Sequence, residues 1–147
     1  DPPAGWDKRI YRDNIMDQIM DLGEEWFVVR YATSKISIYQ YSNTENWYAW
    51  IERAYLHALH RGAFELAAEI SSKSRAIEYR LWGIDLAFEL ACKTNLKEAE
   101  AIARRYLDKA ALNRVVLLKY KKLRAEQKLN KKRDCQEGDD WCVQQIK

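Results

Sequence analysis

The chain has 147 residues and a formal net charge of +3, and this length suits one ordinary domain with a single core. Six tryptophans beside five glycines and two prolines argue against a turn-rich β-sandwich and favour helices. No apolar run reaches about 18 residues, so we predict no transmembrane segment. The sparse glycines form no phosphate-binding loop, and we predict neither enzymatic activity nor a cofactor.

Charge is divided unevenly along the chain. Residues 104–133 contain twelve lysines and arginines against Asp108 and Glu126, a net +10, so the rest of the chain carries −7. This division predicts an acidic body with a basic arm near the C-terminus.

The N-terminal part of the chain has helical spacing at first and mixed signals afterwards. Ile10, Ile15, Ile19 and Leu22 predict an amphipathic helix that ends near Gly23. The next segment, residues 24–42, combines β-branched and aromatic residues with apolar steps of four and three. We predict a helix here because its neighbours are helical, with a β-hairpin at residues 26–41 as the alternative.

Helical signals are clearer after Ser42. Ser42 and Glu45 form a capping box, and an apolar stripe then runs to Gly62. A second helix covers residues 63–70, and a serine-rich link leads into one long helix whose apolar residues continue to Ala91. Asn95 with Glu98 predicts another helix cap.

Two of these helical hairpins repeat each other. A shift of 33 positions superposes the turn residues and acids, and also superposes residues of the preceding helix: Ile51 on Ile84, Ala54 on Ala87, Tyr55 on Phe88, Ala58 on Ala91, Gly62 on Asn95, Glu65 on Glu98 and Ala68 on Ala101. Small residues at a fixed phase allow two helices to approach closely. A helix–turn–helix unit repeated at this period predicts an all-α stack of antiparallel helical hairpins.

These residues resemble the tetratricopeptide-repeat family. The resemblance covers two degenerate repeats over roughly residues 44–109, with Tyr55 and Phe88 bulky where the family usually has a small residue and with no proline closing either repeat. It implies that the first helix of each hairpin lines a concave binding surface. On that helix, one face carries four candidate partner-binding residues: Trp50, Arg53, His57 and His60.

Two alternatives exist for this face. Trp50 can instead pack against the preceding helix, as a core residue. His57 and His60 are three residues apart and face the same side of a helix, the geometry of a metal pair or an acid–base pair, which Glu65 or Glu69 could complete. Such spacing is frequent by chance, and metal sites need further ligands, so we predict no metal site and no catalytic residue.

The basic segment has an inner apolar stripe and an outer polar end. Leu112, Val116, Tyr120 and Leu123 form a stripe that we expect to close the core after the last hairpin. Beyond it the sequence is mostly polar, and its cations could bind nucleic-acid phosphates, although Tyr120 is the only interleaved aromatic residue. The candidate basic-arm residues are Lys121, Lys122, Arg124, Lys128, Lys131, Lys132 and Arg133.

We predict one helical-repeat domain over residues 1–133 and a polar tail over residues 134–147. In the tail, Cys135 and Cys142 bracket a polar loop that could close a short disulfide, whereas Cys92 has the spacing of a buried thiol. The sequence does not identify the cellular compartment of the protein. The Asp1 start and the predicted disulfide favour a processed, exported or organellar protein.

The predicted function is therefore a protein–protein interaction module acting as an adaptor, a chaperone or an accessory subunit of a larger assembly. The alternative is a nucleic-acid-associated protein that binds phosphates through the basic segment. A third hypothesis is a small metal-dependent enzyme that uses His57 and His60.

Overall fold

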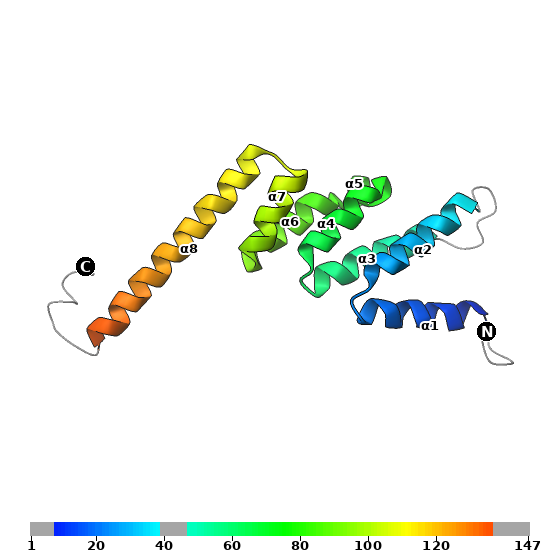
Figure 1. Cartoon of the computed structure of the whole chain (residues 1–147), viewed down its shortest axis with the longest axis horizontal. Helices are drawn as coiled ribbons and strands as arrows, with labels where there is room; N and C mark the ends of the chain where they lie inside the picture. Colours follow the sequence, from blue (N-terminus) through cyan, green and yellow to red (C-terminus); the bar gives the residue numbers. More distant parts are fainter. Residues whose placement is uncertain (1–7, 39–46, 137–147) are drawn as a thin grey trace.

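The computed structural model describes residues 8–38 and 47–136, which form eight α-helices (Figure 1). These residues contain no strand, so the all-α prediction is confirmed and the β-hairpin alternative at residues 26–41 is not supported. Residues 39–41 and the predicted Ser42–Glu45 cap lie outside the described residues. The helices are α1 (Lys8–Asp21), α2 (Glu25–Ile38), α3 (Trp47–His60), α4 (Phe64–Lys73), α5 (Arg75–Leu81), α6 (Gly83–Thr94), α7 (Leu96–Tyr106) and α8 (Lys109–Gln136).

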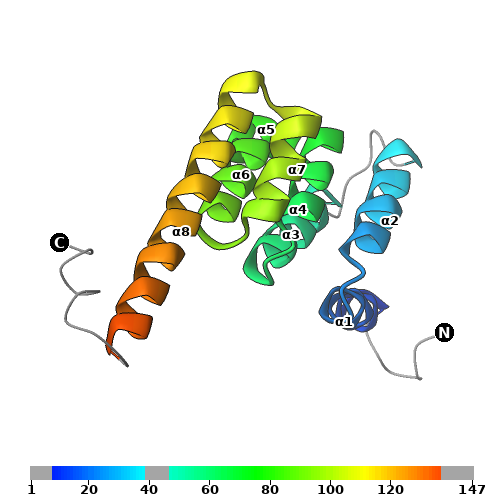
Figure 2. The same cartoon turned by 60° about the vertical axis from the view of Figure 1, so that its left-hand side comes forward.

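The helices pack mainly against their neighbours in chain order (Figures 1 and 2). The closest associations join α2 to α3 and α4 to α6, and α7 then joins α6 to α8. One apolar core runs from Met16 in α1 to Val115 in α8. This arrangement is compatible with a helical repeat. Among the described helices, none has both the length and the apolar content to cross a membrane.

Glycine ends α1 and α3 in the same way. Gly23 and Gly62 both have φ +84°, the left-handed conformation in which glycine carries no steric penalty. After α3, the Gly62 amide donates to the Leu59 carbonyl at 3.1 Å and the Ala63 amide donates to the Ala58 carbonyl at 2.9 Å. This pair of backbone hydrogen bonds is a Schellman motif. The predicted helix ends at both glycines are confirmed.

Asn95 makes the corresponding turn of the second hairpin by a different route. Its φ is −148°, and its side-chain oxygen accepts from the Glu98 amide at 3.3 Å. Asn95 therefore caps the start of α7, as its spacing from Glu98 predicts. The two in-phase turns thus differ in backbone conformation.

The predicted long helix through Ile77 and Ala91 is interrupted at Trp82. Trp82 has φ 49° and ψ 51°, which is an unfavourable left-handed conformation for a residue with a bulky side chain. The break separates α5 from α6. It replaces one straight helix with a short helix that turns before α6 packs on α4.

A buried polar network stabilises this break. The Glu78 carboxylate accepts from the Ser71 hydroxyl at 2.5 Å and from the Ile84 amide at 3.2 Å, so it caps the free N-terminal end of α6. The hydroxyl of Tyr55, which is fully buried, donates to the Gly83 carbonyl at 2.8 Å. These contacts link α3, α4, α5 and α6, and they account for the bulky residue at position 55.

The buried face of α1 differs from the predicted stripe. Met16 and Met20 lie in the core, whereas Ile15 is partly exposed and Leu22 is 80% exposed. Methionine is unbranched and flexible, so it fills irregular space between helices well. Contact with the other helices therefore buries the side of α1 that carries Met16 and Met20.

Candidate functional site

The predicted partner-binding face of α3 is turned toward α1 in the structure. Trp50 is 8% exposed and belongs to the core. The Arg53 guanidinium stacks 4.3 Å from the centre of the Trp50 ring, and its Nη2 lies 2.9 Å from Oδ1 of Asp17 in α1. His60 is exposed. Trp50 is therefore a core residue, as in the alternative interpretation, and Arg53 is paired within the chain.

His57 joins α3 to the end of α1 and the start of α2. Its Nδ1 lies 2.8 Å from Oε1 of Glu25, and its Nε2 lies 3.2 Å from Oδ1 of Asp21. Arg61 donates to both Glu25 oxygens, at 2.5 and 2.9 Å. The Glu25 side chain is fully buried, so these donors compensate for the water that it has lost.

The electrostatics of this joint follow from its geometry. Burial by itself raises the pKa of Glu25, but hydrogen bonds from Arg61, from its own backbone and from His57 outweigh burial and lower the pKa below its ordinary value of 4.5. The same Glu25 hydrogen bond raises the pKa of Arg61. The buried carboxylate is therefore held in its charged form at neutral pH.

This arrangement engages both ring nitrogens of His57 with carboxylates and leaves His60 outside the cluster. Within residues 8–38 and 47–136, no group of three or more His, Cys, Asp and Glu side chains is placed to hold a metal ion. Glu25 and Arg61 were not among the predicted site residues. Their signal was their position, since Glu25 lies two residues after the Gly23 turn and Arg61 directly precedes Gly62.

The inner half of α8 is fixed to the last hairpin. Val115 is fully buried, and Arg114 forms a bidentate pair with Glu89 of α6 that includes an Nη2–Oε2 distance of 2.8 Å. Lys119 pairs with Glu100 of α7. Hydrogen bonding to Arg114 lowers the pKa of Glu89, and hydrogen bonding to Lys119 lowers the pKa of Glu100. Two of the basic residues of this segment thus act in intramolecular contacts.

Toward its C-terminal end, α8 projects beyond the other helices in both views (Figures 1 and 2), and one side of the helix is exposed before that point. Leu112 packs against the core as predicted. Val116, Tyr120 and Leu123 are 57%, 59% and 56% exposed, so the prediction that they close the core is wrong. Successive residues of a helix are rotated by about 100°, and Val115 faces the core, so this neighbouring stripe is turned into solvent. We call Val116, Tyr120 and Leu123 the outer apolar stripe.

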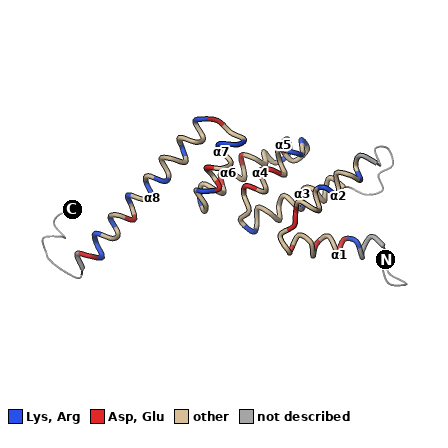
Figure 3. Tube along the Cα trace, in the orientation of Figure 1, with Lys and Arg blue, Asp and Glu red and all other residues tan. Residues whose placement is uncertain are grey.

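The basic arm lies beside this stripe and beyond it. All seven of its cations are exposed, and none forms an ion pair within the described part of the chain. Figure 3 shows the positive charges distributed along α8, whereas negative charges are concentrated on the other helices. The arm comprises Lys121, Lys122, Arg124, Lys128, Lys131, Lys132 and Arg133.

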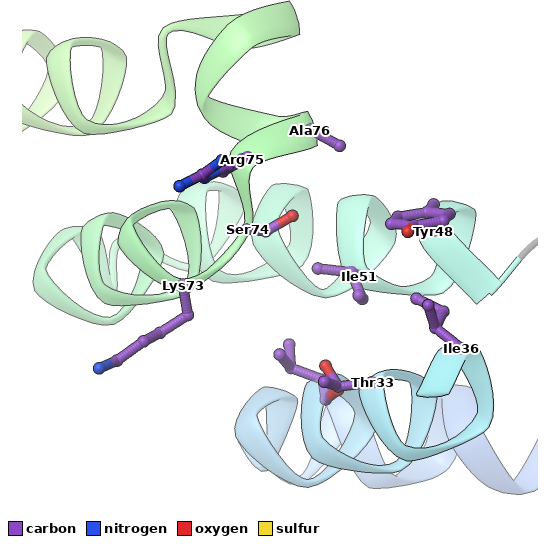
Figure 4. Close-up of a pocket in the computed structure, with 9 residues that line it drawn as sticks. Thr33, Ile36, Tyr48, Ile51, Lys73, Ser74, Arg75 and Ala76 are labelled. Atoms are coloured by element: carbon purple, nitrogen blue, oxygen red, sulfur yellow. The ribbon is translucent and has the colours of Figure 1, made fainter. Parts of the chain in front are cut away.

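A crevice that the sequence did not predict lies between α2, α3 and the junction of α4 with α5 (Figure 4). It has a volume of about 410 Å³. A second hollow of about 500 Å³ continues along α2 and shares Val29, Thr33 and Lys73 with the first. The sequence contains no local pattern for this crevice, because its lining residues come from separate helices that only the fold brings together.

The cysteines are placed as follows. Cys92 is partly buried and free, and burial raises the pKa of its thiol, so it has little thiolate character at neutral pH. Cys135 lies in the last turn of α8, while Cys142 lies outside the described residues. The predicted disulfide therefore stays a prediction.

Comparison with known protein families, with characterised proteins and with solved structures found no match to this chain.

Proposed function

We propose that the chain is a protein–protein interaction module, an adaptor, chaperone or accessory subunit, that docks its partner on the exposed side of α8. The observation that carries this proposal is the exposure of the outer apolar stripe on a helix that projects from the core. Val116, Tyr120 and Leu123 follow one another at steps of four and three, so they share one side of the helix. Exposed apolar surface rimmed by charge is typical of protein interaction sites.

The charges of α8 indicate the kind of partner. Lys121, Arg124 and Lys128 follow a parallel line next to the stripe, at steps of three and four. A second copy of this helix would bring like charges together, which costs free energy, whereas an acidic partner would complement them. We therefore propose a partner with an apolar groove and acidic margins, into which α8 would fit as an amphipathic helix.

The repeat assignment is part of this proposal. We propose that α3 with α4 and α6 with α7 are two hairpins of the tetratricopeptide-repeat type, offset by 33 residues, with α5 inserted between them. The Gly62 turn and the Asn95 cap at corresponding positions support this assignment. In this arrangement the hairpins act as the rigid body that carries α8.

The test uses the full chain as bait in its native source, with co-purifying proteins quantified by mass spectrometry. Tyr120→Ser with Leu123→Ser should remove a stoichiometric partner. The matched control, Leu22→Ser with Phe27→Ser, removes exposed apolar side chains elsewhere and should retain it. Equal loss in both variants, or retention in both, would contradict the proposal.

Nucleic-acid binding is the second candidate, since all seven arm cations are exposed and none pairs with an acidic residue among residues 8–38 and 47–136. A protein that contacts 6–10 phosphates loses roughly 10³- to 10⁵-fold in affinity when the salt concentration rises from 50 to 200 mM. A complex with this steep dependence, lost with Lys128→Gln and Lys131→Gln but kept with the two serine changes, would favour nucleic acid. A protein complex centred on the apolar stripe should show a much shallower dependence.

A further inference from the structure

The crevice beside α2 has an apolar end and a cationic end. Figure 4 shows Ile36 and Ile51 turned toward each other near the Tyr48 ring, while Lys73 and Arg75 lie at the opposite end. Ile51 is buried and Tyr48 is half exposed, so Ile51 forms the base of the apolar end and the Tyr48 ring borders it at the solvent side. The crevice has a volume of about 410 Å³, which is within the range of ligand sites.

The adjoining hollow repeats this pairing of apolar and cationic groups. It is lined by Trp26 and Val29 together with Arg30 and Lys73. Among the described residues, no aspartate or glutamate lines either hollow. Lys73 and Arg75 form no ion pair within the described chain, so their charge is available to an anion.

The length of the crevice distinguishes a peptide from a small anion. Ile36 lines the crevice and Trp26 lines the adjoining hollow, and the two residues are ten positions apart on α2, a span of about 15 Å at the helical rise of 1.5 Å per residue. An extended peptide covers that span with roughly five residues. A fatty acid offers a single carboxylate, whereas the crevice presents Lys73 and Arg75 and the adjoining hollow adds Arg30.

We propose that this crevice binds a short segment of a partner protein in which acidic residues alternate with large aliphatic or aromatic side chains. The apolar side chains occupy the space between Ile36, Ile51 and Tyr48 and the space beside Trp26. The acidic side chains pair with Lys73, Arg75 and Arg30. This site is formed by α2, α3, α4 and α5, whereas the outer apolar stripe lies on α8, so the proposal does not depend on the role proposed for α8.

A random dodecapeptide library displayed on phage tests the proposal against the full chain. Enriched peptides should contain Asp or Glu next to Leu, Ile, Phe or Trp. The best peptide, synthesised with a fluorescent label, should bind about ten-fold more weakly to Lys73→Glu with Arg75→Glu, because two ion pairs become repulsive. Thr33→Tyr, which narrows both hollows from an exposed position, should weaken binding to a similar degree.

The matched control is Lys121→Glu with Lys128→Glu, which makes the same change in net charge on α8 and should leave the affinity unchanged. Loss of binding in this control would assign the peptide to the basic arm and overturn the proposal, as would enrichment without acidic residues. Circular dichroism checks that each variant is folded. If no peptide enriches while dodecanoate shifts the amide resonances of Thr33 and Lys73, the occupant is a small amphipathic anion and the peptide proposal is wrong.

Discussion

Close backbone packing joins α4 to α6, whereas charged side chains join the N-terminal helices to the end of α3. At the first contact, fully buried alanines lie on both helices, and a side-chain carbon added to Gly83 would lie 2.7 Å from Cβ of Ser71. At the second, the buried Glu25 is satisfied by Arg61 and His57. Packing of this kind is intolerant of added volume and insensitive to pH. Ionic contacts tolerate added volume better, but they weaken when the pH or the salt concentration changes the charges or their screening.

The difference indicates separate roles for the two regions. The centre determines the relative positions of the hairpins, and it includes the strained Trp82 and the network around Glu78. The N-terminal joint attaches α1 and α2 to this centre, and α2 forms one wall of the crevice. A change in the joint should therefore alter the crevice more than it alters the hairpins.

The largest effect is expected for Gly83→Ala. The new carbon would lie 2.2 Å from the Ser71 oxygen, so α4 and α6 would have to move apart, at a cost of about 3 kcal/mol in the free energy of unfolding. Urea denaturation measures this loss. Combining it with Ser71→Gly, which removes the obstructing side chain, should restore much of the stability. A loss below about 1 kcal/mol in the single variant would show that the helices are less closely packed than described.

A smaller effect is expected for Tyr55→Phe. This change removes the hydrogen bond to the Gly83 carbonyl while leaving the ring in place, and it should cost about 1 kcal/mol. Thermal unfolding would report it as a lower Tm. Tyr31→Phe is the matched control, since the Tyr31 hydroxyl has no such contact with Gly83 and its loss should be nearly neutral. Equal changes in Tm in the two variants would contradict the stabilising role assigned to the buried Tyr55 hydroxyl.

The smallest and most localised effect is expected on acidification. The pKa of Glu25 is lowered in the folded chain, so its contribution to stability is present above 4.5 and is lost as the pH falls through the lowered folded value. Hydrogen exchange should then increase at the start of α2 before it increases in α6. Glu25→Gln should abolish this pH dependence. Simultaneous loss of protection in both helices would indicate that the joint and the centre open as one unit.

Several parts of the fold were predictable because their signals are local. Apolar periodicity predicts the helix at residues 47–60, and the Asn95–Glu98 cap predicts the start of the helix at residues 96–106. Gly62 marks the end of the first of these helices, and Gly23 marks the end of α1 in the same way. Residues 25–38 were ambiguous because their β-branched and aromatic residues favour a strand, whereas the steps of four and three between apolar residues fit a helix. Burial of Val28 and Ala32 against the core resolves this segment as a helix.

The candidate site was less predictable because helical periodicity identifies faces but not what covers them. The sequence placed Trp50, Arg53 and His57 on one side of α3, yet only the tertiary structure brought Asp17, Asp21 and Glu25 against them. The interruption at Trp82, the exposure of Tyr120 and Leu123, and the crevice beside α2 also depend on contacts between distant residues. By itself, the sequence determined the all-α composition, the helix ends and the separation of charge, because hydrogen bonding, capping and charge are properties of neighbouring residues. The tertiary structure decided which apolar faces are buried and which cations are paired, because burial depends on where other helices lie.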